Sequence, residues 1–309
     1  MRSKLVFLLV AGLMSVAAPS AAEPDRVTTT EHFRFVYRPR YHPVIRRTIE
    51  AADTVRDEVI RRVGAPVIEP VTEVRMARNI DEMRSLSPRP PPDYADAVAF
   101  WPDNVMVISL TSSQHRPVTL DTVFRHELAH MALRWVIGDA HVPRWFNEGL
   151  AVVTSDELPM ERLKLLWPAV ARGEVTPLKR LDRSFPPRDF QVNQAYAESA
   201  DFVRFLVRFR GRWRFQELLV RVRDGEPFDA AMAATWGMPV RELEDEWHDD
   251  LRRRYSVVPS VTAGLTLWAA VGVFLVVVYV KRRRDVRRRI AAMSDGPEGR
   301  DSQVGDTGP

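Results

Sequence analysis

The feature that most constrains the fold of this chain is an uncharged segment near its C-terminal end. Residues 256–280 contain no Asp, Glu, Lys or Arg, and about 20 apolar residues in an α-helix cross the roughly 30 Å hydrocarbon core of a bilayer. Seven basic residues follow within 281–289, and the positive-inside rule places such a cluster in the cytoplasm. We therefore expect a single-pass membrane protein with a transmembrane helix over 257–280 and with residues 23–256 extracytoplasmic. A basic run is also typical of lipid-recognition and nuclear-targeting segments.

The two ends of the chain have the composition of segments outside a globular domain. A basic start at Arg2 and Lys4 precedes an apolar run and the small residues 20–22, which is the pattern of a secretory signal peptide. We predict that residues 1–22 are a cleaved signal peptide, with an uncleaved membrane anchor as the alternative. Residues 281–309 are first basic and then rich in Gly, Pro and Asp, which predicts a cytoplasmic tail that is disordered towards its end.

Composition narrows the chemistry that the chain can perform. It contains no cysteine, which excludes disulfide bonds and the thiolates typical of structural zinc sites, so any zinc would have His and carboxylate ligands. The net charge of +4 comes from the ends, because without residues 1–22 and 281–309 the chain has 35 basic and 36 acidic residues. The remaining part is nearly neutral and lacks the basic footprint of a nucleic-acid-binding protein.

Hydrophobic periodicity predicts strands in the first part of the chain and helices after them. Phe33, Phe35 and Tyr37 alternate with polar or smaller residues, as expected of a half-buried strand over 28–37. Further strands are expected over 71–77, 97–101 and 105–110, the last two as a hairpin, and helices over 42–63, 120–137, 144–154, 159–171, 194–209, 212–223, 227–235 and 240–255. This order predicts an α+β fold with a mostly helical C-terminal half.

The sequence His126-Glu127-Leu128-Ala129-His130 lies within the predicted helix over 120–137. A spacing of four residues places His126 and His130 on one helix face, where two neutral imidazoles reach a single metal ion. Glu127 lies about 100° further around the axis. It is therefore badly placed as a ligand, but it can reach a water molecule bound to the metal and act as general base. The motif predicts a catalytic site with one Zn²⁺ per chain; the alternative is two surface histidines beside a solvated glutamate.

The third metal ligand is not determined by spacing. A catalytic zinc ion usually has three protein ligands and one open position. The residues that follow the motif include His141, Glu148, Glu157 and Glu161, and each carries a suitable donor atom. A glutamate in a window of this length is expected by chance, so these residues alone leave the choice open.

The motif HELAH followed by WFNEGLA at 145–151 resembles the gluzincin zinc metallopeptidases, and most of residues 23–256 is similar to their peptidase MA-like domains. The resemblance implies a zincin (thermolysin-like) catalytic domain in which a second helix supplies Glu148 as the third zinc ligand. It also implies a peptide or protein substrate, an edge strand at 105–110 that binds it, and Tyr196 as the hydrogen-bond donor to the oxyanion.

Two comparisons with related families refine this resemblance. Metzincins do not fit, because they would have Gly and His where this chain has Leu133 and Val136. The aminopeptidase branch of the gluzincins has a Gly-Ala-Met-Glu-Asn segment that binds a free amino terminus, and residues 97–101 contain no such carboxylate, so endopeptidase action is at least as well supported. Two other classes stay open as alternatives, a catalytically inactive zincin-fold module that binds peptides and a signalling module that acts through its tail.

Overall fold

The computed structural model describes residues 25–65, 71–92, 95–111, 119–156, 159–183 and 189–294. The predicted signal peptide at 1–22 and the end of the predicted tail lie outside the described residues. Contacts divide the chain into two compact units, one comprising Met1–Leu166 with Val175–Glu244 and the other Trp167–Glu174 with Asp245–Pro309. The first unit contains the sheet and all the candidate site residues.

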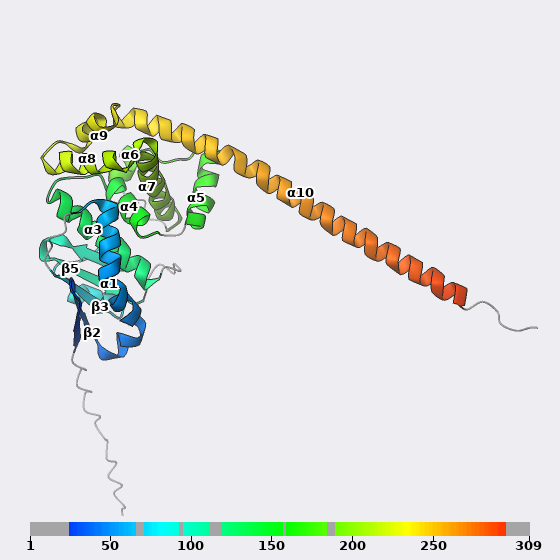
Figure 1. Cartoon of the computed structure of the whole chain (residues 1–309), viewed down its shortest axis with the longest axis horizontal. Helices are drawn as coiled ribbons and strands as arrows, with labels where there is room; N and C mark the ends of the chain where they lie inside the picture. The colour runs from blue at the N-terminus through cyan, green and yellow to red at the C-terminus, as the bar shows by residue number, and fades with distance from the viewer. Residues whose placement is uncertain are drawn as a thin grey trace, which may run out of the picture. The chain divides into compact units, whose positions relative to one another are not determined.

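A five-stranded mixed sheet forms the N-terminal half of the first unit (Figure 1). Its strands lie in the order β1-β2-β3-β5-β4. The two central pairs, β2 with β3 and β3 with β5, are parallel, whereas β1 with β2 and β4 with β5 are antiparallel. The strands are β1 (Arg26–Thr29), β2 (Phe33–Tyr37), β3 (Thr72–Ala77), β4 (Ala97–Phe100) and β5 (Val105–Ser109).

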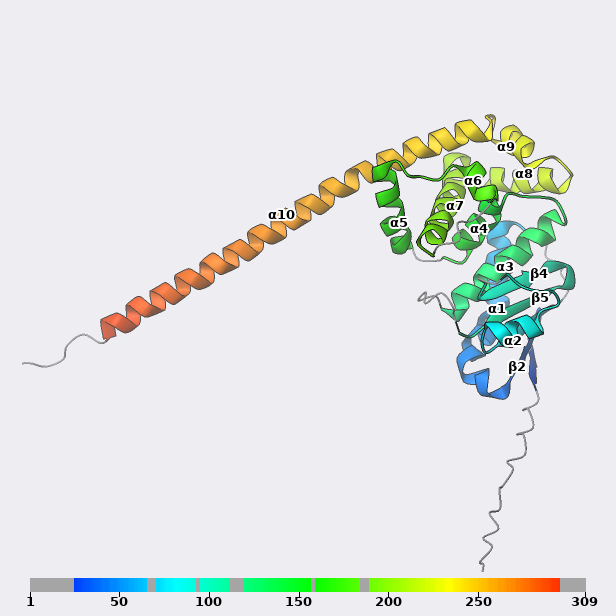
Figure 2. The ribbon, with the colours of Figure 1, turned by 180° about the vertical axis from the view of Figure 1, so that it is seen from behind.

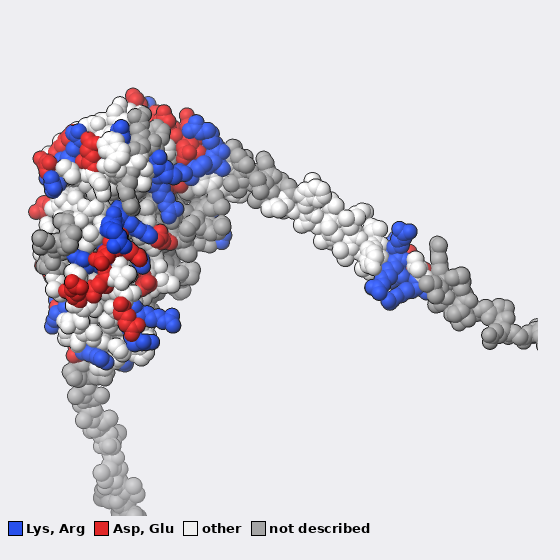
Figure 3. Space-filling view, viewed as in Figure 1, with Lys and Arg blue, Asp and Glu red and all other residues white. Residues whose placement is uncertain are grey.

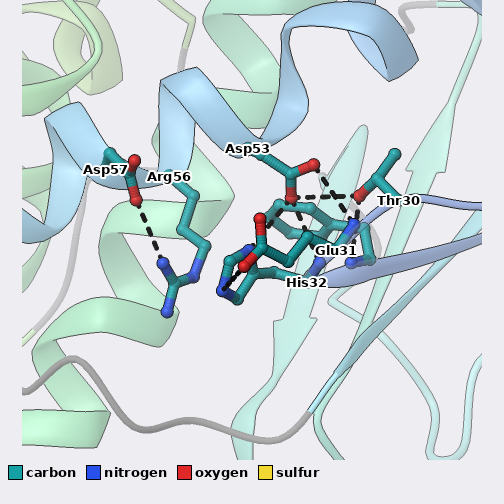
Figure 4. Close-up of polar contacts among 7 residues, drawn as sticks. Thr30, Glu31, His32, Asp53, Arg56 and Asp57 are labelled. Atoms are coloured by element: carbon teal, nitrogen blue, oxygen red, sulfur yellow. Dashed lines mark hydrogen bonds and ion pairs between the residues drawn. The ribbon is translucent and has the colours of Figure 1, made fainter.

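Two predictions about the strands were wrong. The single strand expected over 28–37 is a hairpin of β1 and β2, because Asp53 binds the intervening turn (Figure 4). Its carboxylate accepts hydrogen bonds from Thr30 Oγ1 at 3.0 Å and from the backbone N–H of His32 at 3.1 Å. The segment 105–110 is not an edge strand, since β5 pairs with β3 on one side and with β4 on the other, which makes β4 the edge.

Helices cover both faces of the sheet (Figures 1 and 2). On one face, Phe124 of α3 packs against Phe33 and Phe35 of β2, with ring centroids 5.3 and 6.1 Å apart. Successive side chains of a strand point to opposite faces of the sheet. The other face therefore has its own small core, in which Met83 of α2 packs with Ala77 of β3. The helices of this layer are α1 (His42–Val63), α2 (Ile80–Leu86) and α3 (Leu120–Ile137), and the predicted bounds of α1 and α3 are confirmed.

The remainder of the first unit is helical, which confirms the α+β class. Its core is aromatic, with Trp145 and Phe146 of α4 packed against Phe202, Phe215 and Phe228 from three later helices. Helix α6, like α2, was not predicted from the sequence. Its helices are α4 (Arg144–Thr154), α6 (Leu178–Arg183), α7 (Asp189–Arg210), α8 (Arg212–Arg223) and α9 (Phe228–Trp236), together with the first part of α5 (Pro159–Arg172), whose last residues belong to the second unit.

The last helix, α10 (Val240–Ser294), joins into one element the two helices predicted over 240–255 and 257–280. Within it, Leu265–Arg288 contains an apolar stretch that is long enough to cross a membrane, by length and composition. In Figure 3 its white apolar stretch is followed by a blue cluster of Lys and Arg. The described residues contain one helix of this kind.

Candidate metal centre

Helices α3 and α4 bring three metal-binding side chains together. His126 and His130 lie on one face of α3, with ring centroids 4.9 Å apart. Glu148 of α4 directs its Oε2 atom towards both, at 3.6 Å from His126 Nε2 and 3.7 Å from His130 Nε2. One donor atom from each of the three residues lies within 4.8 Å of the others, so the group could hold a metal ion.

These separations fit a tetrahedral zinc ion. Zinc binds imidazole nitrogen and carboxylate oxygen at about 2.0–2.2 Å, and tetrahedral angles then place neighbouring ligand atoms about 3.4 Å apart. The two nitrogen–oxygen distances of 3.6 and 3.7 Å are close to that value. Two imidazoles and one carboxylate are also the donor set of many catalytic zinc sites, with a fourth position left for solvent or substrate.

Asn147 orients one of the imidazoles. Its side-chain oxygen Oδ1 lies 2.9 Å from Nδ1 of His130, and a carbonyl oxygen only accepts hydrogen bonds. The proton therefore resides on Nδ1, and the lone pair of Nε2 points towards Glu148, as a metal ligand requires. Asn147 was not predicted as a site residue, although its position directly before Glu148 in WFNEGLA was the available signal.

Glu148 is ionised in this environment. Burial by itself would raise the pKa of its carboxyl, but the hydrogen bond from His126 and the neighbouring His130 and Arg144 outweigh that effect and lower the pKa. Arg144 lies one helical turn earlier on α4, with its Nε atom 3.8 Å from Glu148 Oε1. The other oxygen, Oε2, is the one that faces the two histidines, so Glu148 presents a negatively charged donor to the metal position.

Glu127 lies beside this group and does not belong to it. Its side chain is only 7% exposed and accepts a hydrogen bond from the backbone N–H of Ala99 in β4. Burial raises the pKa of Glu127, while the neighbouring His130 and His126 oppose the shift. A carboxylate with a raised pKa is a stronger base than an exposed one, which suits a proton acceptor.

A close approach of α4 and α7 completes the site. A Cβ atom added to Gly149 would lie 2.5 Å from the backbone oxygen of Ser199, so only glycine allows the two helices to pack at this distance. The approach places Tyr196 of α7 beside His126, with ring centroids 6.5 Å apart. The structure thus brings all five predicted site residues, His126, Glu127, His130, Glu148 and Tyr196, to the lining of one cleft.

The alternative third ligands are not found in this group. His141 is exposed and is not among the three residues that share a metal position. Glu157 lies outside the described residues, and Glu161 is described only as part of the backbone of α5. Among the side chains that the structure describes, Glu148 is the one that joins the two histidines.

The cleft over the site has a volume of about 650 Å³, and its lining includes Ala97, Val98 and Ala99 of the edge strand β4. The backbone N–H of Ser109 donates to the carbonyl oxygen of Asp96 at 2.8 Å. Along an antiparallel strand, every second residue forms backbone hydrogen bonds with the neighbouring strand. Asp96 bonds to β5, so Ala97 and Ala99 direct their backbone groups to the free edge of the sheet. The hydrogen bond from Ala99 to Glu127 agrees with this alternation.

Comparison with known families defines the class of the protein. The model of the Peptidase MA superfamily matches residues 59–253, a range that includes the whole metal centre and more than half of the chain. The chain therefore belongs to the Peptidase MA superfamily, which confirms the resemblance to gluzincin peptidase MA-like domains. Membership supports a metallopeptidase-like domain around the His126, His130 and Glu148 group. A search of curated proteins found no match.

Proposed function

We propose that this protein is a zinc-dependent metallopeptidase with a zincin (thermolysin-like) catalytic domain. The observation that carries the proposal is the arrangement around the cleft, in which His126, His130 and Glu148 share one metal position. Glu127 lies next to that position without joining it. A binding module would need the metal-binding group or the cleft, but it would not need a buried proton acceptor beside them.

The residues divide the work of hydrolysis. A zinc ion held by His126, His130 and Glu148 would act as a Lewis acid that polarises a peptide carbonyl and makes a water molecule more acidic. Glu127 accepts the proton of the attacking water and passes it on to the leaving amine. Tyr196, which lines the same cleft on the side of His126, donates a hydrogen bond to the oxygen that becomes negatively charged.

The edge strand β4 supplies the surface on which a substrate is held. An extended peptide can pair as an added strand with the outward-facing backbone groups of Ala97 and with the carbonyl oxygen of Ala99, whose N–H binds Glu127. Side chains of that peptide would then enter the cleft, whereas its backbone would lie across the metal position. Residues 97–101 contain no carboxylate that could bind a free amino terminus, but Asp96 lines the cleft. Comparing the cleavage of N-acetylated peptides with that of peptides with a free amino terminus therefore distinguishes endopeptidase from aminopeptidase action.

We further propose that the enzyme is anchored in a membrane by α10. The segment 257–280 would cross the bilayer, residues 23–256 would lie outside the cytoplasm after removal of the signal peptide 1–22, and the basic residues that follow would lie inside. The candidate span Leu265–Arg288, which overlaps this segment over 265–280, supports a membrane-crossing helix. Protease added outside intact cells should degrade residues 23–256 and spare a fragment with the C-terminal tail, whereas a protected N-terminal part would contradict the orientation.

Metal-dependent hydrolysis is the test of the main proposal. The full-length protein in detergent should bind about one zinc ion per chain and should cleave peptides of a mixed library detected by mass spectrometry. A chelator should abolish the cleavage, and added zinc should restore it. Cleavage that persists after complete removal of the metal would overturn the assignment. Zinc binding without any cleavage would favour the catalytically inactive zincin-fold module.

A further inference from the structure

Two arginines line the same end of the cleft. Arg134 lies four residues after His130 on α3, and Arg144 lies four residues before Glu148 on α4, so each is one helical turn away from a candidate metal ligand and on the same helix face. Only residues 138–143 connect the two helices, which brings the C-terminal end of α3 next to the N-terminal end of α4. Both side chains line the cleft.

Arg134 is a half-buried cation in this position. Its Nη1 atom donates hydrogen bonds to the backbone oxygens of Gly138 at 3.3 Å and Ala140 at 2.9 Å, which orient the guanidinium. Burial lowers the pKa of Arg134, and the negative charge of Asp139 acts in the opposite direction. Among the described residues, no carboxylate forms an ion pair with Arg134. An arginine in such a site stays protonated, so an anion that reaches this end of the cleft gains a favourable partner.

The other end of the cleft has a different character. Its α3 side is formed by Leu120 and Val123, which precede His126, and Val44 and Leu110 also line the cleft. The carboxylates of Glu127 and Glu148 belong to the metal position, where a divalent ion would offset their charge. Asp96 is the remaining acidic residue of the lining. The two arginines thus give one end a positive charge, while apolar side chains mark the other.

We propose that Arg134 and Arg144 form a carboxylate-binding subsite that selects substrates with a negative charge close to the scissile bond. This inference rests on the proposed peptidase function, since it names a preference of the same cleft. A guanidinium presents its N–H groups in a planar fork that matches a carboxylate, and such charge-assisted pairs are stronger than neutral hydrogen bonds. The carboxylate is that of an Asp or Glu side chain or that of a peptide's C-terminal end.

Matched peptides test this subsite. The starting point is a peptide that the full-length protein cleaves, acetylated at its N-terminus and amidated at its C-terminus. At each position flanking the scissile bond in turn, one version carries Glu and the matched version carries Gln. At one flanking position, kcat/KM for the Glu peptide should exceed that for the Gln peptide by about 10-fold to 100-fold. The ratio should fall as NaCl is raised, because salt screens partly exposed charges. A third peptide with Gln and a free C-terminal carboxylate shows whether the chain end is the preferred source.

Variants locate the effect. Arg134→Gln should bring the Glu-to-Gln ratio close to one, and Arg134→Lys should leave an intermediate ratio. Arg125→Gln is the matched control on the same helix, since Arg125 pairs with Glu58 and is not part of the cleft lining, and it should keep the wild-type ratio. Binding of both peptides to Glu127→Gln protein, measured by fluorescence anisotropy, gives a readout independent of hydrolysis and should show the same preference.

The outcomes separate this inference from the function on which it rests. A zinc-loaded protein that cleaves no peptide overturns the proposed function. Efficient cleavage with equal kcat/KM for Glu and Gln peptides at every flanking position, and with no gain from the free C-terminal carboxylate, overturns the carboxylate subsite alone. A strong preference for Glu that survives both Arg134→Gln and Arg144→Gln also overturns it, since the carboxylate would then be bound elsewhere. Zinc content and thermal midpoint, measured for each variant, identify any protein that has lost its fold.

Discussion

The side-chain oxygen of Asn147 lies 2.9 Å from Nδ1 of His130, so the residue that precedes one candidate ligand orients another. Removing it should weaken metal binding without removing a ligand. We expect Asn147→Ala to reduce zinc affinity about 10-fold to 100-fold, the usual effect of losing such a partner. Competition with a chromophoric chelator measures the change. Asn147→Asp keeps an acceptor for Nδ1 and should retain most of the affinity; equal losses in both variants would contradict the orienting role.

Gly149 lies at a close approach of α4 to α7. In Gly149→Ala the new Cβ atom would meet the backbone oxygen of Ser199 at 2.5 Å, and backbone atoms cannot move aside as a flexible side chain can. We expect a loss of about 1–3 kcal/mol of stability or more, as for overpacked cores, together with weaker peptide hydrolysis because Tyr196 is displaced. Thermal unfolding in detergent measures the first effect. Gly272→Ala is the control, since nothing lies within 4 Å of its Cβ position, and it should leave the midpoint unchanged.

Glu198 gives the first unit a pH-dependent stability. It is fully buried on α7, where its Oε1 atom accepts hydrogen bonds from the backbone N–H of Thr176 and from Gln194 Nε2. Burial raises the pKa of Glu198 from 4.5 to about 7. Between these values the folded protein holds a proton that the unfolded chain has released, so stability falls as pH rises from about 4.5 to 7. The full effect corresponds to about 3 kcal/mol.

Comparison with a neutral analogue isolates this effect. Glu198→Gln has the shape of the protonated acid and no proton to lose, so its stability should exceed that of the wild type increasingly above pH 5. Unfolding midpoints of both proteins, measured from pH 5 to 8, give the difference in stability at each pH. The other carboxyl groups are common to the two proteins, so their titration does not contribute to this difference. Two curves that remain parallel over this range would show that the pKa of Glu198 is not raised in the folded state.

Local sequence signals were sufficient for α1 and for α3, the helix that carries the two candidate histidine ligands. Thr119 accepts a hydrogen bond from the N–H of Thr122 at the start of α3, and Gly64 and Gly138 end α1 and α3 at positive φ. These residues act within one helical turn, so the two helices are determined locally and hydrophobic periodicity predicted both correctly. The metal-binding pair His126 and His130 is local in the same sense.

Features that depend on distant residues were missed. The turn between β1 and β2 forms because Asp53, 23 residues after Thr30, binds it, and no local pattern reveals that contact. The edge position of β4 follows from the order of the strands in the sheet, which the sequence does not state. Spacing alone could not choose Glu148, because helix packing at Gly149 decides which residue reaches the histidines; only the family resemblance indicated it.

The choice of Glu148 over His141 has its own test. Glu148→Ala should remove one of three ligands and lower zinc affinity by several orders of magnitude, whereas His141→Ala should leave one zinc ion per chain, because His141 is exposed and lies outside the group. Metal content after dialysis against a weak chelator compares the two variants. Loss of zinc in His141→Ala with retention in Glu148→Ala would reverse the assignment.

Glu127 distinguishes an enzyme from a binding module. Its carboxylate lies beside the ligand group and accepts a hydrogen bond from Ala99 N–H, so its proposed task is to accept a proton and not to hold the metal. Glu127→Gln keeps the size and the hydrogen-bonding oxygen but removes the basic group. We expect the variant to retain one zinc ion and its fold, and to lose about 10²–10⁴-fold in kcat. Metal analysis, thermal unfolding and peptide cleavage measure the three properties. If the variant loses its zinc, Glu127 is a ligand; if the wild type hydrolyses peptides no faster than the variant, the cleft binds peptides without cleaving them.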